Sequence, residues 1–174
     1  GLPFASGHYL ALRDMVSSSV GPAYRAVWHR DPSGPWTIYT TADPEVSCPR
    51  YFGSLTDAEK VPTIEVTWGS DSDLDVTISA AELTWRIELG SSPATRAMTA
   101  MGGRMPAAAW NSNAVLASMG PMARTFLRPG RVRLQGATPN GPRFKAAPVQ
   151  VWRVVGGGAA LRGENLGELG PLAT

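Results

Sequence analysis

The chain has 174 residues, a net charge of +2 and a single cysteine. A chain of this length normally forms one domain and buries a core without covalent cross-links. One cysteine excludes an internal disulfide and a zinc site built from several cysteines. The charge is small and scattered, which argues against a nucleic-acid-binding face. Without a long apolar run or a leader-like start, we expect no membrane span and a cytoplasmic location.

The first third of the chain predicts a hairpin. Residues 9–16 fit either a strand or a short helix, whereas 23–29 and 36–41 alternate clearly and flank a turn at 31–34. Pro32 sets the backbone angle that a type I turn needs at its second position. Period-two alternation puts one set of side chains from each arm on a shared face: Tyr24, Ala26 and Trp28, and Trp36, Ile38 and Thr40.

A meander is expected next. Residues 43–53 hold two prolines and a glycine, which indicates an irregular connection rather than a central strand. Residues 64–68, 74–78 and 83–89 then alternate at period two, as half-buried strands do. Their polar positions are expected on a wet outer face with cross-strand charge pairs, although they could instead line a polar cavity: Glu65, Asp75, Arg86 and Glu88.

A helical segment is predicted after the meander. Ser92 can cap a helix, and Pro93 suits its first turn. Residues 94–101 favour a helix, and Gly102 and Gly103 are predicted to end it.

A second helical stripe follows. Apolar side chains recur at helical spacing over residues 115–127, interrupted by Gly120 and Pro121. This interruption predicts two short helices or one kinked helix. We therefore expect a helical insertion over residues 92–128.

The last part of the chain returns to strand patterns. Residues 131–136 alternate, and 149–155 form the last long strand. Gly156–Gly158 are predicted to turn the chain into a short strand over 159–162.

Seven or eight strands around one helical excursion fit either a β-sandwich or a closed barrel. A barrel removes the exposed edges that an open sheet must protect. We therefore predict a mainly β fold, an antiparallel closed or nearly closed barrel of about eight strands whose interior can hold one small ligand. It would be a single β-barrel domain over residues 1–174, with two short helices inserted.

This layout resembles two barrel groups, the lipocalin-like proteins and the acetoacetate-decarboxylase-like proteins. Segments 28–32 (WHRDP), 48–53 (CPRYFG) and 161–167 (LRGENLG) are also similar to uncharacterised actinobacterial proteins. The lipocalin resemblance implies a lipophilic ligand, and the group includes cofactor-free enzymes of secondary metabolism. The decarboxylase chemistry needs a Schiff-base lysine, but the comparable stretch reads Pro49-Arg50. Arginine cannot form that imine, so this activity is not carried over.

Four residues are candidates for hydrogen bonding or proton transfer. His29 lies at the end of a hairpin arm, where a histidine can act as a general base. Cys48 is interpreted as a buried thiol rather than a nucleophile. With only two histidines and no carboxylate three or four residues away, no metal site is expected. The candidate catalytic residues are Tyr24, His29, Arg50 and Tyr51.

Aromatic and thioether side chains are the candidate ligand contacts. Tryptophans would form the walls of a cavity, and the methionines of the helical insertion would form a lid or simply pack. The candidate ligand-binding residues are Trp28, Trp36, Trp68, Trp85, Met98, Met101, Met119, Met122 and Trp152.

The resulting hypothesis is binding of a lipophilic small molecule in a barrel cavity. Chemistry there would be cofactor-independent cyclisation or isomerisation, driven by confinement and orientation. The alternative is a non-catalytic carrier, or a module that forms homodimers through Met-rich helices. We expect no cofactor, metal or nucleic acid in either case.

Overall fold

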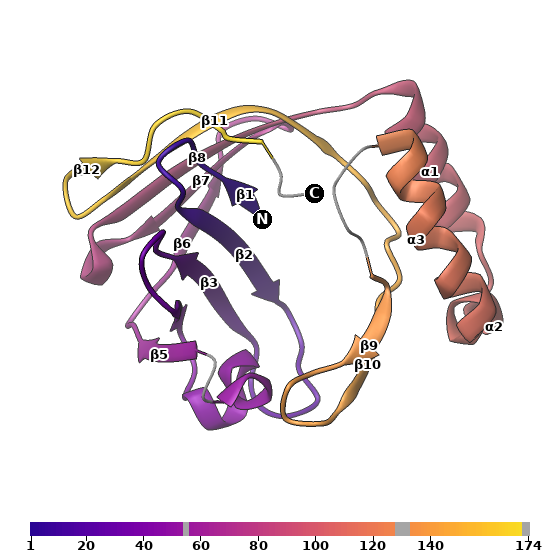
Figure 1. The fold of residues 1–174 in the computed structure, drawn as a ribbon, viewed down its shortest axis with the longest axis horizontal. Helices are drawn as coiled ribbons and strands as arrows, with labels where there is room; N and C mark the ends of the chain where they lie inside the picture. Colours follow the sequence, from indigo (N-terminus) through magenta and orange to yellow (C-terminus); the bar gives the residue numbers. More distant parts are fainter. Residues whose placement is uncertain (54–55, 128–132, 172–174) are drawn as a thin grey trace. The chain divides into compact units, whose positions relative to one another are not determined.

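The computed structural model describes residues 1–53, 56–127 and 133–171, with the backbone alone for 122–127. It divides into two compact units, whose elements are shown in Figure 1. The β unit comprises Gly1–Glu88 and Gly156–Pro171, and the helical unit comprises Leu89–Val155. The prediction of a single domain over the whole chain stays a prediction.

The first sheet of the β unit has five strands in sequence order. They are β1 (Leu2–Pro3), β2 (Tyr9–Met15), β3 (Tyr24–Arg30), β4 (Trp36–Thr40) and β5 (Thr56–Lys60). Neighbours pair antiparallel except β4 and β5, which are parallel. The predicted hairpin is confirmed, and the ambiguous N-terminal segment is a strand.

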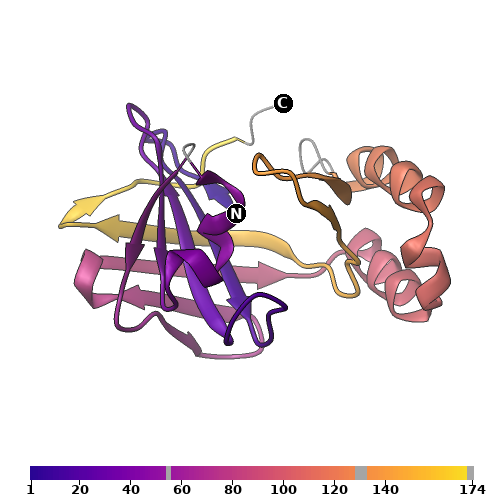
Figure 2. The same cartoon turned by 90° about the horizontal axis from the view of Figure 1, so that it is seen from below.

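The second sheet also has five strands, in the order β12-β11-β8-β7-β6. Their bounds are β6 (Glu65–Trp68), β7 (Asp73–Ile78), β8 (Leu83–Gly90), β11 (Arg153–Leu161) and β12 (Glu164–Asn165). The pairing of β6, β7 and β8 confirms the predicted meander. In Figure 2 the strands of the two sheets cross steeply.

The predicted barrel is wrong, because neither sheet closes. In the described residues the first sheet ends at β1 and β5, and the second ends at β12 and β6. The strand β5, which was not predicted, pairs parallel with β4, while the meander forms its own sheet. Alternation fixes which side chains share a face, but it does not determine which strand lies at an edge.

The two sheets bury their faces differently. The strands β7 and β8 alternate as predicted, with Val76 and Trp85 buried while Asp75 and Arg86 are exposed. In contrast, β3 and β4 are buried on both faces, because a 3₁₀ segment covers one of them. This cover consists of η1 (Pro44–Val46) and η2 (Cys48–Tyr51) and accounts for the irregular connection.

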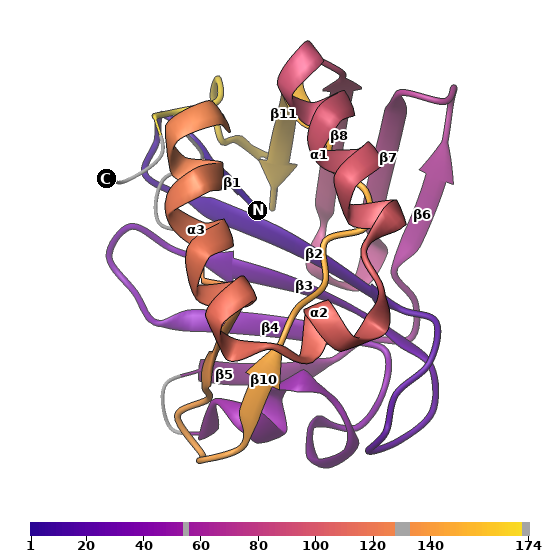
Figure 3. The ribbon, with the colours of Figure 1, turned by 90° about the vertical axis from the view of Figure 1, so that its right-hand side faces the viewer.

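The helical unit holds the helices α1 (Pro93–Arg104), α2 (Ala107–Asn111) and α3 (Asn113–Leu127), shown in Figure 3. It also holds a small sheet of β9 (Gln135–Ala137) and β10 (Arg143–Lys145). Within the described residues, no helix combines the length and apolar character needed to cross a membrane.

The start of α1 is as predicted, but its end is not. Ser92 accepts a hydrogen bond from the Thr95 backbone N–H at 3.2 Å, and the Thr95 hydroxyl accepts one from the Ser92 N–H at 2.7 Å. This capping box satisfies backbone donors that a helix start leaves free. The helix then continues through Gly102 and Gly103 to Arg104, because hydrogen bonding along the helix outweighs the cost of two glycines.

The predicted turn at Gly156–Gly158 is wrong, because these glycines lie inside β11. Gly157 has a φ of +147°, and a Cβ there would lie 2.4 Å from the Arg86 carbonyl oxygen. The glycine therefore allows a backbone approach to β8 that any side chain would obstruct. Residues 149–152, predicted as strand, lie outside β11, and 131–132 fall outside the described residues.

Candidate functional site

A groove of about 590 Å³ lies on the β unit, between the 3₁₀ segment and β5. We call it the β5 groove. It is lined by Pro44, Glu45, Val46, Pro49, Arg50, Gly53, Thr56 and Ala58.

Local sequence explains the walls of this groove. A proline lies at the start of each 3₁₀ turn, where its fixed φ is favourable and its missing N–H is not needed. On the other wall, the parallel register pairs Trp36 with Thr56 and Ile38 with Ala58. Period-two alternation then puts Thr56 and Ala58 on the face that the 3₁₀ segment covers.

The groove combines apolar and charged groups. Pro44, Val46 and Ala58 supply apolar surface, while Glu45 and Arg50 bring opposite charges and are both exposed. The Thr56 hydroxyl is buried and has no hydrogen-bond partner among the described residues.

A buried, mainly apolar cluster lies between the first sheet and the 3₁₀ segment, which contributes Cys48 to it. Tyr24, Ala26, Ile38, Ala42 and Cys48 pack together as one core. Burial, followed by the neighbouring Cys48, raises the pKa of Tyr24 to about 12. Burial also raises the pKa of the Cys48 thiol, although the nearby Trp28 and Tyr24 side chains oppose this effect. Cys48 is therefore a protonated, unreactive thiol at neutral pH.

Two of the predicted wall tryptophans meet on this side of the sheet. Trp28 packs edge-on against Phe52 with ring centroids 4.4 Å apart, and against Trp36 at 6.0 Å. The Trp28 indole N–H is buried and lacks a well-formed hydrogen bond among the described residues, although it lies close enough to the Cys48 sulfur to favour the thiolate. Tyr9 extends the aromatic row to Trp36 at 5.5 Å.

The other predicted ligand contacts are dispersed. Trp85 is in the core of the second sheet, whereas Trp68 on β6 is 54% exposed. Trp152 belongs to the helical unit and is also exposed.

The predicted methionine contacts lie in the helical unit. Met119 is buried with Leu116 and Leu134, and Met101 packs against this cluster. Met98 is half-buried on α1, and the side chain of Met122 lies outside the described residues.

The four acid–base candidates do not form one constellation. Tyr24 is in the buried cluster, and the nearby Tyr51 contributes to the rise of its pKa. Arg50 lines the β5 groove. His29 alternates with Trp28 along β3 and therefore points to the opposite face of the first sheet.

His29 has a partner that sequence reasoning missed. His8 Nδ1 lies 2.9 Å from His29 Nε2, and both rings are buried. The ring centroids are 5.1 Å apart and the planes differ by 12°. The distance between the ring centroids is about the N···N distance plus the centre-to-nitrogen distances of the two rings. The rings therefore lie edge to edge, with the two nitrogens between the centroids. A histidine just before one strand and a histidine near the end of the next is the signal that could have revealed the pair.

Charged groups surround the histidine pair. Burial, then the neighbouring His8, lowers the pKa of His29; Asp31 opposes this effect and Arg162 adds to it. The Asp31 carboxylate accepts hydrogen bonds from the Ser33 backbone N–H at 2.8 Å and its hydroxyl at 2.7 Å, and these bonds lower its pKa. His29 is thus a neutral base at pH 7.

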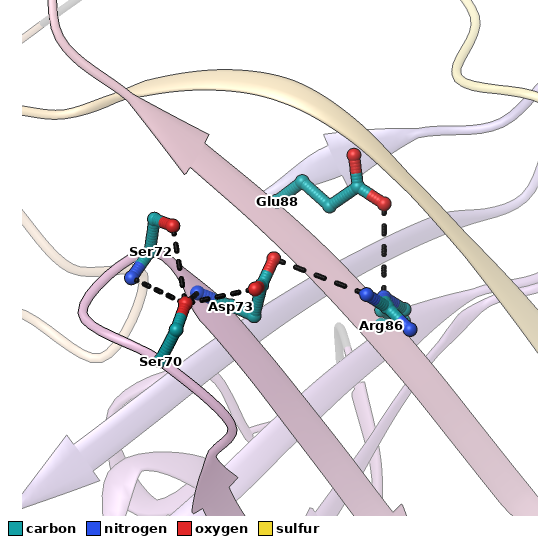
Figure 4. Close-up of polar contacts among 5 residues, drawn as sticks. All are labelled: Ser70, Ser72, Asp73, Arg86 and Glu88. Atoms are coloured by element: carbon teal, nitrogen blue, oxygen red, sulfur yellow. Dashed lines mark hydrogen bonds and ion pairs between the residues drawn. The ribbon is translucent and has the colours of Figure 1, made fainter.

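The outer face of the second sheet carries a surface network, drawn in Figure 4. Arg86 lies 3.6 Å from Glu88 and 4.0 Å from Asp73, and the Ser70 hydroxyl donates to Asp73 at 2.8 Å. These groups are exposed or half-buried, as the predicted wet face requires. Such exposed pairs contribute little to binding or stability.

No three His, Cys, Asp or Glu side chains converge as a metal site within the residues that the structure describes. Comparison of the chain with protein-family models, curated proteins and solved structures finds no match. The resemblance to barrel families therefore stays a prediction, and the geometry alone supports a functional proposal.

Proposed function

We propose that this chain binds a small amphipathic organic acid in the β5 groove. The observation that carries the proposal is a concavity of about 590 Å³ with apolar walls and an arginine in its lining. Pockets for small molecules usually have volumes of about 300–1,000 Å³ and combine apolar lining with a few polar groups.

The chemistry of the lining selects the ligand class. The prolines and valine of the 3₁₀ segment suit an apolar body, while the positive charge of Arg50 in the lining favours a negatively charged group such as a carboxylate. Glu45 in the same wall would repel a second negative charge. We therefore expect a monoanion rather than a dianion.

The proposed role is binding without catalysis, as in a carrier. The predicted acid–base residues do not support catalysis in the groove, because His29 points to the other face of the sheet and Tyr24 is buried in the core cluster. Cys48 is protonated at neutral pH. A reduced, unpaired thiol fits a reducing compartment, which is where we place this binding activity.

The Met-rich dimer interface receives less support. Met101 and Met119 pack with Leu116 in the core of the helical unit, so these thioethers are occupied by intramolecular contacts.

Filling the groove tests the proposal. Ala58 and Glu59 are adjacent on β5, but Ala58 lines the groove and Glu59 alternates to the other face. We expect A58F to weaken binding of aliphatic or aromatic monocarboxylates by at least about tenfold, because the new ring occupies the site. The matched control E59F should bind as the parent chain does.

Isothermal titration calorimetry over a carboxylate panel, with amides of the same shape as neutral controls, measures this difference. If no monocarboxylate binds, or if A58F binds as well as E59F, the proposal is wrong.

A further inference from the structure

We propose that His8 and His29 together bind a divalent transition-metal ion of the zinc class at the end of β2 and β3. This site is independent of the β5 groove, because His29 and the groove lie on opposite faces of the first sheet. The proposal goes beyond ligand binding, since it assigns chemistry to the chain's two histidines.

Strand register brings the two rings together. Tyr9 pairs with Arg30 and Leu10 pairs with His29 in the antiparallel ladder of β2 and β3. Continuing that ladder by one residue puts His8 opposite Asp31, and alternation puts His8 and His29 on the same face. The loop before β2 is held by hydrogen bonds from the Phe4 N–H to the His8 carbonyl and from the Gly7 N–H to the Phe4 carbonyl, at 2.8 and 2.9 Å.

The distance between the rings suits a shared metal ion. His8 Nδ1 and His29 Nε2 lie 2.9 Å apart and point at each other. Two nitrogen ligands with metal–nitrogen bonds of about 2.0–2.1 Å lie about 2.8–3.4 Å apart when the angle between them at the metal is between 90° and 109°. Opening by half an ångström or less, together with a turn of each ring by about 35–45° so that its lone pair points at the ion, converts the hydrogen-bonded pair into a chelating pair.

A metal ion can displace the proton between the rings without releasing it from the protein. One of the facing nitrogen atoms now carries the N–H, and the other accepts it. When a metal ion takes that position, the protonated ring changes tautomer and carries its proton on the outer nitrogen. Both inner lone pairs are then free to bind the ion, and no net charge is added to the protein.

The charges around the pair limit how tightly it binds. The negative charge of Asp31 interacts electrostatically with both histidines, and the positive charge of Arg162 interacts with His29. The Asp31 carboxylate is turned toward Ser33, so it compensates charge rather than completing a third ligand. With two protein ligands, water fills the other positions, and we expect exchangeable binding rather than a structural zinc site.

Zinc titration of the full, tag-free chain tests the site. We expect one Zn²⁺ per chain by isothermal titration calorimetry. H8Q and H29Q should each weaken that binding by at least about tenfold, since loss of even an outer-shell partner costs 10–100-fold. D71N removes an exposed carboxylate between β6 and β7, so it serves as the matched control and should bind Zn²⁺ as the parent chain does.

A second measurement does not depend on variants that fold. In chain labelled with ¹⁵N-histidine, Zn²⁺ should shift one Nδ1 and one Nε2 resonance, belonging to His8 and His29 respectively. Unchanged histidine resonances, or equal Zn²⁺ affinity in the parent chain, H8Q and H29Q, would overturn the proposal.

Discussion

Cys48 is the first residue of η2 and is buried in the core cluster with Tyr24 and Trp28 beside it, so burial sets its chemistry. Burial raises the pKa of its thiol, so little of the reactive thiolate forms at neutral pH. We predict that iodoacetamide at pH 8 modifies Cys48 at least about tenfold more slowly in the native chain than in urea. Mass spectrometry of the alkylated chain measures both rates. Equal rates would show that the 3₁₀ segment does not protect the sulfur.

Tyr24 in the same cluster links stability to alkaline pH. Its pKa is about 12 in the folded chain, against about 10 in an unfolded one, so the folded state disfavours the phenolate. The contribution of this group to stability is intact below pH 10 and decreases as the pH rises from 10 to 12. We predict that urea unfolding midpoints fall over this range in the parent chain and fall less in Y24F. If the unfolding midpoints of both chains fall equally, Tyr24 is not the group that links stability to pH in this range.

At the scale of elements, hairpins could be predicted from the sequence and strand edges could not. The alternation of Tyr24, Ala26 and Trp28 predicted their shared face, because the side chains of a strand alternate whatever it pairs with. The position of β5 beside β4 depends on a parallel pairing across the 3₁₀ segment, which leaves no local signal. For the same reason, only Arg50 of the predicted catalytic residues lines the groove.

The glycines of β11 offer a matched pair of substitutions. Gly157 has a φ of +147° and meets the Arg86 carbonyl, whereas a Cβ at Gly158 would have nothing within 4 Å. We predict that G157A lowers the free energy of unfolding by about 2–3 kcal/mol, because the strained backbone and the clash act together. G158A should change it by less than about 1 kcal/mol. Urea denaturation followed by circular dichroism measures the free energy of unfolding of both variants. If the two variants lose similar amounts of stability, the close approach to Arg86 does not explain why glycine occupies position 157.

At the scale of the whole molecule, each unit has a core of its own. Leu116, Met119 and Leu134 form the core of the helical unit, while Val76 and Trp85 are buried in the β unit. Composition and length constrain the size of a core but not how it is divided, so the prediction of one domain stays a prediction. The histidine pair was missed because His8 and His29 are 21 residues apart, and only the register of β2 and β3 unites them.

The division into units predicts where a core mutation acts. Leu116 is 1% exposed and Val76 is fully buried, so L116A and V76A each leave a cavity. We expect a loss of about 2–5 kcal/mol for L116A and about 1–3 kcal/mol for V76A, since less volume is removed from valine. If each unit opens cooperatively by itself, L116A accelerates amide exchange mainly within Leu89–Val155 and V76A mainly within the β unit. Native-state hydrogen exchange with mass spectrometry resolves the two regions. If either substitution accelerates exchange equally in both, the chain unfolds as a single domain, as its length predicts.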